Sequence, residues 1–387
     1  MSAISTNGHD ARPAICDVAI VGGGLVGAAI AYGLRHQAQR IVVLDEGDVA
    51  FRASRGNFGL VWVQSKGFTL PDYARWSLAS AQSWPELSAY LKDRTGIDVE
   101  LKQPGGLHLC LSQEEMDTRK ERLQWLQDEV GPHYQFEMLD YDELRKRVPL
   151  VGPDVVGATY TPMDGHTNPL KLFRALYDAA AKEGVQFKTG CGTEDISYAN
   201  GIFTVKAGGK LWQAPKLVLA AGLGNNKLAP KVGLFAPVEP NRGEVLISER
   251  LRPMLSYPTN FVRQTDEGTV QIGDSHEDVG FDDGTITSVL GGIAKRGIKC
   301  FPALANANLV RAWAALRVMS PDGYPIYQAS ESHPGAFVVT CHSGVTLAAN
   351  HVMRIAPWIA GGAYPDAIRE FKGDRFLNKD LVFTNGH

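Results

Sequence analysis

The chain has 387 residues, of which 44% are hydrophobic and 21% charged, and its formal net charge is −3. This length is more than one small hydrophobic core requires, so we expect two interleaved domains. The nearly balanced charge gives no reason to expect nucleic acid or an anionic membrane surface as a partner.

The five cysteines are scattered and include no Cys-x-x-Cys pair. This argues against zinc, an iron–sulfur cluster or a disulfide framework, so we expect no metal and a reducing compartment. The first fifteen residues contain Asp10 and Arg12 and lack an apolar core, so we predict no secretory signal. No apolar run approaches the ~20 residues that span a bilayer. We therefore expect a cytoplasmic protein.

The first predicted elements are a short buried strand, a glycine turn and a helix, within CDVAIVGGGLVGAAIAYGLRH. After the strand, Gly22, Gly24 and Gly27 follow the pattern G-x-G-x-x-G. The first glycine permits a tight turn, the second lets the backbone approach a pyrophosphate, and the third lets the helix pack on the strand. The helix N-terminus offers free N–H groups to the phosphates. The pattern predicts a dinucleotide site; the alternative is a glycine-rich turn in another α/β unit.

A second predicted strand, residues 41–44, ends in Asp45 and Glu46. An acid at this distance from the glycines is placed to accept hydrogen bonds from a ribose 2′-OH. The motif alone does not separate FAD from NAD, so an NAD-dependent dehydrogenase is an alternative at this point.

The segment after the acid, FRASRGNFGLVWVQSKG, is unlike an NAD domain, which usually starts another helix and strand here. Its pattern S-x-x-N-x-G-L resembles the stretch that lies along the flavin and ribityl chain in the D-amino-acid oxidase superfamily of FAD-dependent oxidoreductases. Arg52 and Arg55 are nearby cations and candidates for the phosphates. The alternative for the segment is an ordinary polar loop. The resemblance implies cofactor contacts from Ser54, Asn57, Gly59 and Leu60.

Two further segments fit the same family. A loop leads into a predicted helix near Pro169, since proline suits the first helical turn, and a strand follows. The later run KLVLAAGLGNN predicts a strand that returns to a small-residue turn beside the cofactor, at Ala221 and Gly222. The chain departs from the family near Glu194, where an apolar residue usually lies against the adenine.

The last third resembles the closing half of glycine oxidase, sarcosine oxidase and the C subunit of hydrogen cyanide synthase. The most specific part is L-R-x-x-S-P-D-G-x-P-I-Y, residues 316–327. Relatives place an arginine at the position of Arg317 to hold the substrate carboxylate. A planar guanidinium makes two parallel charge-assisted hydrogen bonds to a carboxylate, which positions the substrate over the flavin. The alternative is an arginine in a surface or structural salt bridge.

The segment CHSGVTLAANHVMRIA predicts a loop followed by a helix that starts at about Gly344. We expect this helix to be broken near Pro357. A helix N-terminus directed at the flavin stabilises the negative charge that forms on reduction. His342 is a candidate for contact with substrate or flavin, or else a local cap or packing residue. The backbone candidates for the flavin are Ser343, Gly344, Val345 and Thr346.

Phe261 corresponds by position to an aromatic residue that lines the substrate pocket in relatives; the alternative is strand core. His276 is expected to be a solvated loop residue. Some relatives attach FAD through a cysteine in the segment matching 313–319, which has no cysteine here, so noncovalent FAD is expected. Sarcosine-oxidase-like members carry a lysine linked to oxygen activation where this chain has Gln271, which favours a dehydrogenase passing electrons to a partner or quinone.

The expected fold is α/β, with a Rossmann-type FAD-binding domain interleaved with a mixed-sheet substrate domain. We expect apolar residues of the segment 77–96 to pack in the core. The FAD domain is predicted from residues 14–65, 155–235 and 330–387, and the substrate domain from 66–154 and 236–329.

The stretches RGNFGLVWVQ and SHEDVGFD resemble most closely the branch that includes the C subunit of hydrogen cyanide synthase, D-hydroxyproline dehydrogenase and the B subunits of octopine and nopaline oxidases. This implies an amine oxidoreductase that oxidises the C–N bond of an opine, another N-substituted amino acid, or a D-amino acid or D-hydroxyproline. One alternative is a stand-alone oxidase of glycine, sarcosine or a simple D-amino acid that uses O2. Another is the flavin-carrying subunit of a heteromeric dehydrogenase that is inactive alone.

Overall fold

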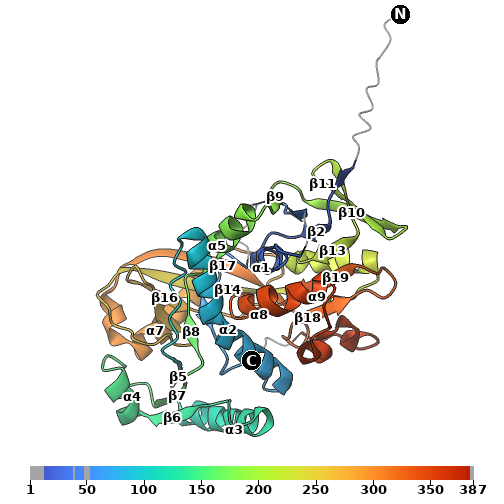
Figure 1. Cartoon of the computed structure of the whole chain (residues 1–387). Helices are drawn as coiled ribbons and strands as arrows, with labels where there is room; N and C mark the ends of the chain where they lie inside the picture. Colours follow the sequence, from blue (N-terminus) through green and yellow to red (C-terminus); the bar gives the residue numbers. More distant parts are fainter. Residues whose placement is uncertain (1–12, 38–39, 48–52, 384–387) are drawn as a thin grey trace, which may run out of the picture.

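The computed structural model describes residues 13–37, 40–47 and 53–383, and it confirms the predicted α/β class (Figure 1). A six-stranded sheet forms the centre of one half, in the order β18-β19-β13-β2-β3-β9. All neighbours are parallel except β18 and β19. The strands are β2 (Val18–Val21), β3 (Ile41–Leu44), β9 (Gln186–Lys188), β13 (Lys216–Leu219), β18 (Ile326–Ala329) and β19 (Ala336–Thr340).

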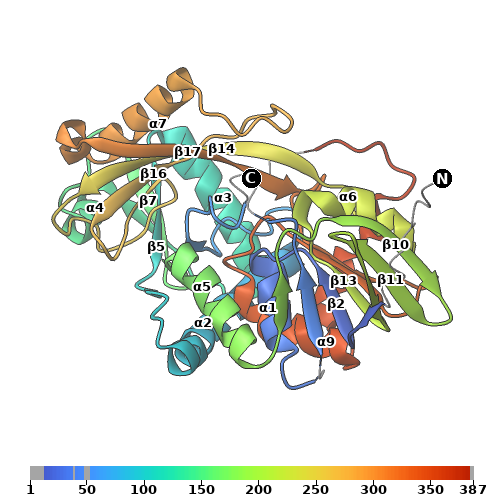
Figure 2. The same cartoon turned by 90° about the horizontal axis from the view of Figure 1, so that it is seen from above.

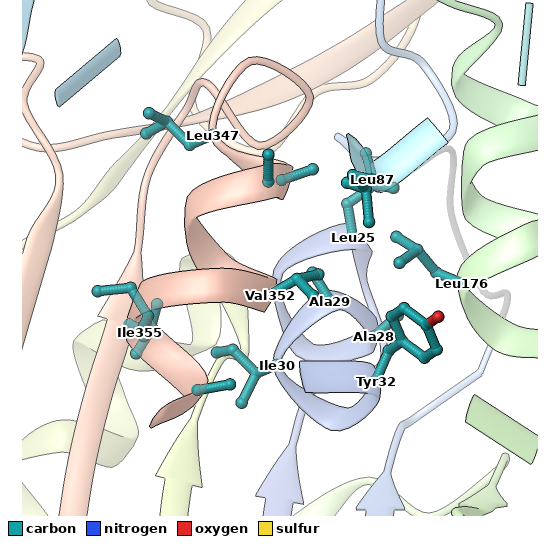
Figure 3. Packing of buried hydrophobic residues seen from close by; sticks show 14 of the residues in the cluster. Leu25, Ala28, Ala29, Ile30, Tyr32, Leu87, Leu176, Leu347, Val352 and Ile355 are labelled. Carbon is teal, nitrogen blue, oxygen red and sulfur yellow. The ribbon is translucent and has the colours of Figure 1, made fainter. Parts of the chain in front are cut away.

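Helices cover one face of this sheet. Figure 3 shows α1 packed between α5 and the C-terminal helical segment, with Ala28, Ala29 and Ile30 against Leu176, Val352 and Ile355. Small residues on α1 let its neighbours approach closely. The helices are α1 (Leu25–Gly33), α5 (Pro169–Lys182), α8 (Ala348–Asn350) and α9 (Ala356–Ala360), with a π-helical turn at His351–Ile355.

A four-stranded sheet, in the order β1-β12-β11-β10, packs on the other face through a shared apolar cluster that includes Val21, Val42 and Phe203. A short helix, α6 (Asn225–Leu228), follows β13. The strands are β1 (Ala14–Ile15), β10 (Thr193–Ala199), β11 (Ile202–Ala207) and β12 (Lys210–Ala214).

The other half contains a four-stranded antiparallel sheet, in the order β15-β16-β14-β17, whose two long strands run side by side in Figure 2. The register pairs Asn241 with Arg317. A helix, α7 (Thr287–Cys300), packs on this sheet with Ile293 in its core. The strands are β14 (Glu239–Arg250), β15 (Val262–Gln264), β16 (Thr269–Gly273) and β17 (Leu309–Met319).

A three-stranded sheet, β5-β7-β6, extends this half, and a bridge between Leu107 and Thr259 joins the two sheets. A further pair, β4 (Leu60–Val61) and β8 (Gly165–His166), is antiparallel. The remaining elements here are β5 (Gly106–Cys110), β6 (Glu137–Asp140), β7 (Gly157–Thr161), α3 (Gln113–Val130) and α4 (Tyr141–Arg147).

The long helix α2 (Pro71–Thr95) contacts elements of both halves, including α3, α5 and α8. The apolar residues expected in the core, among them Leu78, Trp84 and Leu91, are buried on this helix. Short 3-10 turns lie at Gly222–Gly224, Ala229–Val232, Pro302–Asn306, Asp366–Phe371 and Gly373–Phe376. Among the described residues, no helix is long and apolar enough to cross a membrane.

Candidate active site

The turn between β2 and α1 requires glycine at the positions that the motif identified. Gly22 has φ +102°, and a Cβ on it would lie 2.4 Å from the carbonyl oxygen of Ala220. A Cβ on Gly27 would lie 1.9 Å from the carbonyl oxygen of Gly22. Gly24 caps α1 without a side-chain hydrogen bond. The turn is therefore tight, and it leads directly into the N-terminus of α1, the end of a helix that binds phosphate.

The predicted acids lie at the end of β3 beside this turn. Asp45 accepts hydrogen bonds from the backbone N–H groups of Gly23, at 2.7 Å, and Gly47, at 2.8 Å. Its carboxylate is thereby fixed at the glycine turn, and each oxygen keeps a lone pair for a ribose hydroxyl. Glu46 is exposed.

In the segment predicted to follow the flavin, Ser54 lies at the start of α1, whereas Asn57 and Gly59 lie further along the chain. The Ser54 hydroxyl accepts a hydrogen bond from the N–H of Leu25 at 2.9 Å, so this side chain lies at the start of α1, at the phosphate end. Asn57 Oδ1 accepts from the N–H of Gly59 at 2.7 Å. Gly59 has φ +91°, and a Cβ there would lie 2.6 Å from the carbonyl oxygen of Thr167. Arg55 is exposed. The remaining candidate of this segment, Arg52, lies outside the described residues.

The C-terminal candidates lie against the same segment. The Thr346 hydroxyl donates to the carbonyl oxygen of Leu60 at 3.2 Å and accepts from the N–H of Trp62 at 3.1 Å. The carbonyl oxygen of Thr346 accepts from Ser80 and Trp84 of α2, at 2.7 and 3.1 Å. The turn at residues 343–346 is therefore held between the flavin segment and the long helix.

The helix expected at Gly344 begins later. Residues 343–347 form a turn, with Leu347 N–H donating to the carbonyl oxygen of Ser343, and α8 starts only at Ala348. The expected break near Pro357 is wrong: Pro357 occupies the first turn of α9, where a missing N–H is tolerated, after the π-helical turn.

The small-residue turn after β13 lies next to the glycine turn. A Cβ on Gly22 would lie 2.8 Å from Cα of Ala221, whose N–H donates to Asn225 Oδ1 at 3.0 Å. Gly222 has φ +56°. The two turns thus meet at the carboxyl ends of adjacent parallel strands, where ligands of open α/β sheets bind.

A cavity of about 680 Å³ opens between the flavin segment and the antiparallel sheet. Trp62 lies in its wall although sequence reasoning did not select it. The glycine turn is not among the residues that line this cavity. The predicted residues that line it are Asn57, Leu60, Phe261, Arg317, His342, Ser343, Val345 and Thr346.

Arg317 of β17 lies where a substrate-binding arginine was predicted, and it also forms a salt bridge, the alternative considered for it. It lines the cavity, and its Nη2 forms an ion pair with Asp274 Oδ2 at 2.6 Å. Its Nη1 donates to the carbonyl oxygen of Ser275 at 2.8 Å and to Asn241 Oδ1 at 3.0 Å. The guanidinium is therefore held rigidly at the cavity wall. His276 is exposed, as expected for a solvated loop residue, and it also lines the cavity, where partial desolvation and the nearby Arg317 lower its pKa.

His342 belongs to a buried hydrogen-bonded group. Its Nδ1 lies 3.1 Å from the carbonyl oxygen of Gly323, which requires a proton on Nδ1 and leaves Nε2 as the acceptor. Nε2 lies 3.2 Å from Lys66 Nζ and 3.1 Å from the hydroxyl of Ser343. Burial lowers the pKa of Lys66 to about 8, with Arg317 acting in the same direction. With such a pKa the amine loses its proton above about pH 8 and is then a proton acceptor.

Phe261 lies just before β15. It lines the cavity and also packs against neighbouring side chains, so both interpretations considered for it apply. The guanidinium carbon of Arg296 lies 3.8 Å from its ring centroid, and His108 contacts it edge-on at 5.9 Å. A second buried cation, Arg263, donates to the carbonyl oxygen of Phe58 and to Gln271 Oε1. Burial lowers the pKa of Arg263 to about 10.

Sequence reasoning missed Lys66, Arg119, Asp274 and Arg296, all of which line the cavity. Lys66 alone left a signal, because it ends an apolar strand-like run directly after the flavin pattern. The others come from helices and loops whose contacts depend on the tertiary fold.

Three comparisons place these observations among known proteins. Residues 17–353 match the family model described as "FAD dependent oxidoreductase". The chain is 44% identical to the B subunit of opine oxidase from Rhizobium meliloti, over 93% of this chain and 97% of that one. The B subunit of opine oxidase from Agrobacterium tumefaciens strain Ach5 is 43% identical, over 95% of this chain and 99% of that one. The crystal structure of glycine oxidase from Geobacillus kaustophilus superposes with a TM-score of 0.88 at 25% sequence identity. The superposition covers 94% of this chain and 100% of the glycine oxidase chain.

These matches confirm the predicted FAD dependence and fold. The residues of the chain also fit this cofactor. The positions where a Cβ would meet backbone form a cradle at the turn after β2, and Asp45 lies beside it. The cavity begins at Ala53 and Asn57, close to the start of α1, and gives room for the flavin end.

Proposed function

The chain belongs to the family of FAD-dependent oxidoreductases, and from this membership we propose that it oxidises the C–N bond of an N-carboxyalkyl amino acid, an opine-type secondary amine. The observation that carries the proposal is the position of Arg317, whose guanidinium lines the same cavity as Asn57 and Val345. The two relatives named as B subunits of opine oxidase support the substrate class.

Bound FAD supplies the acceptor for the hydride of the amine-bearing carbon. Arg317 binds the adjacent carboxylate and fixes the position of that carbon, since orientation is a large part of catalysis. The substrate amine must be neutral to be oxidised. Lys66 and His342 hold a basic nitrogen pair in the cavity wall and accept the proton that the substrate ammonium releases. Water then hydrolyses the imine product to an oxo acid and an amino acid.

We propose that the FAD phosphates bind at Gly22, Gly24 and Gly27 and that Asp45 holds the ribose. Residues 57–60 and the turn 343–346 would hold the flavin. Attachment is proposed to be noncovalent: the segment 313–319 contains no cysteine, and Trp313 there donates to the carbonyl oxygen of Gly56 at 3.2 Å.

The chain is proposed to act as a dehydrogenase that passes electrons to a second subunit or a quinone. Both opine-oxidase relatives are named as B subunits, and the chain covers nearly their whole length. Where sarcosine-oxidase-like members carry lysine, the side chain of Gln271 is buried and accepts from Arg263 at 2.9 Å. The second candidate, a stand-alone oxidase, is favoured by the 27% identity to glycine oxidase.

A cytoplasmic location is proposed as well, because all five cysteines are free and three are buried. We also propose that residues 66–154 and 236–329 form the substrate domain.

The test is to mix the FAD-loaded chain anaerobically with a panel of amines and record the flavin band. Opines, D-amino acids, hydroxyprolines, sarcosine and glycine form the panel. Bleaching by opines alone supports the proposal, and bleaching by glycine or sarcosine with rapid reoxidation by O2 supports the stand-alone oxidase. A flavin band that no member bleaches in the chain alone, but opines bleach once a copurified subunit is added, identifies the heteromeric form.

A further inference from the structure

The cavity has a second polar region, away from the Arg317–Asp274 pair, that the oxidation step does not use. Arg296 of α7 stacks on Phe261, and Asn260 precedes Phe261 in the chain. All three line the cavity. Contact with the face of an aromatic ring restrains a guanidinium while its N–H groups stay able to bind a carboxylate.

Two donors of this region have no acceptor among the described residues. Arg296 Nε is buried without a hydrogen-bond partner. The carboxylate of Glu115 lies 3.6 Å from Arg296 Nη2, too far for a hydrogen bond, while its other oxygen accepts from the N–H of Leu111 at 2.6 Å. Asn260 uses Oδ1 to accept from Leu109 N–H at 3.1 Å, and its buried Nδ2 has no acceptor. Because buried donors are nearly always paired in native proteins, these two groups represent unused hydrogen-bonding capacity beside the cavity.

The charge of the region also favours an anion. Arg119, one helical turn after Glu115, is 7% exposed and lines the cavity. Its hydrogen bonds go to neutral oxygens of Ser65, Gln64 and Thr159. Burial lowers its pKa to about 10. The described residues that line the cavity comprise four Arg side chains, Lys66 and three carboxylates, so the lining is net positive whether or not Lys66 carries its proton.

The two cationic regions are connected through Phe261. The carbonyl oxygen of Phe261 accepts from the N–H of Gly273 at 2.9 Å. The next residue, Asp274, is the ion-pair partner of Arg317. Arg296 thus contacts Phe261, which is hydrogen-bonded to the residue before Asp274, and both guanidinium groups line the same cavity, so we infer that one elongated ligand can meet both.

We propose that Arg296 and Asn260 bind a second carboxylate of the substrate, while Arg317 binds the first. The inference rests on the proposed function and adds a reason for selectivity: an N-carboxyalkyl amino acid fills both positions, and an N-alkyl amino acid fills one. A carboxylate at this second position lies beside the two side chains whose buried donors, Arg296 Nε and Asn260 Nδ2, lack acceptors.

The test compares two substrates that differ by one carboxylate, N-(1-carboxyethyl)alanine and N-isopropylalanine. The FAD-loaded full chain, with any subunit that copurifies, is mixed anaerobically with each, and the concentration dependence of flavin reduction gives a Kd and a limiting rate. The wild type is expected to bind the dicarboxylate at least about tenfold more tightly, equivalent to about 1.4 kcal/mol. Arg296→Met is expected to reduce this ratio to about one, with the loss in Kd rather than in the limiting rate.

Asn260→Asp gives a second, isosteric test, because it keeps the acceptor for Leu109 N–H, removes the amide donors and adds a negative charge. It is expected to lower the ratio by tenfold or more, on the order of one charge-assisted hydrogen bond. Lys295→Met, on the exposed side of the same helix, is the control for a lost positive charge. An unchanged ratio in both cavity variants overturns the inference while leaving amine oxidation intact. Failure of both substrates to reduce the flavin overturns the proposed function instead.

Discussion

The two halves of the molecule build their binding surfaces in different ways. At the central sheet, the surface is backbone: Gly22 and Gly27 leave no space for a Cβ, and the turn leads directly into the N-terminus of α1. At the antiparallel sheet, the surface consists of charged side chains such as Arg317 and Arg296, each from a different element. A backbone site is encoded within a few consecutive residues, whereas a side-chain site depends on the whole tertiary fold.

The largest expected effect lies in the side-chain half. Arg317→Met should weaken substrate capture by about 2–5 kcal/mol, because it removes one partner of a charge-assisted pair and leaves Asp274 unneutralised in the cavity wall. The value of kcat/KM should fall accordingly while FAD content stays normal. An unchanged kcat/KM would remove Arg317 from the substrate site.

Gly27→Ala tests the backbone half. Its added Cβ meets the carbonyl oxygen of Gly22 at 1.9 Å, so the turn must shift; we expect a loss of about 1–3 kcal/mol in stability and reduced FAD content. Gly292→Ala is the matched control, because nothing lies within 4 Å of its Cβ and alanine favours a helix. Urea unfolding and the ratio of flavin to protein absorbance measure both effects. Normal FAD binding by the Gly27 variant would contradict the role given to this turn.

Lys66 lies where the two halves meet, and its buried charge should destabilise the fold. Its pKa falls from 10.5 in the unfolded chain to about 8 in the folded protein. The unfolded state therefore binds more protons between these values, and stability should rise as pH increases from 8 to 10.5, while the full cost is present below pH 8. Lys66→Met should stabilise the protein at pH 7 by about 1–2 kcal/mol and flatten this slope.

Thermal unfolding at a series of pH values measures the stability of the wild type and of Lys66→Met. Lys120→Met, on the exposed face of α3, is the control. A loss of stability at pH 7 in Lys66→Met would show that the contact with His342 outweighs the burial of the charge.

The smallest effect concerns a local motif within the side-chain half. Asp140 accepts from the N–H of Glu143 at 2.8 Å, and the Glu143 carboxylate accepts from the N–H of Asp140 at 3.1 Å, which forms a capping box on α4. Asp140→Ala should cost about 1 kcal/mol in urea unfolding without changing FAD content or kcat/KM. A change in either would show that α4 is coupled to the cavity.

The same division explains how far the sequence predicted the molecule. The turn after β2, Asp45 and the core face of α2 are properties of short segments, and the structure has them where the sequence placed them. The helix expected at Gly344 starts instead at Ala348, because the preceding turn is held by α2 through Thr346. Neither the pairing of Arg317 with Asp274 nor the stacking of Arg296 on Phe261 leaves a local pattern, since each joins residues distant in the chain.

In the proposed reaction, one cavity brings an amino-acid-like amine to bound FAD for C–N oxidation. The most direct measurement is an anaerobic single turnover of the FAD-loaded protein with N-(1-carboxyethyl)alanine, followed by product analysis. We expect that the flavin band is bleached and that one pyruvate and one alanine form for each flavin reduced. A flavin band that stays unbleached by this compound and by every other amine, with or without a copurified subunit, would contradict it.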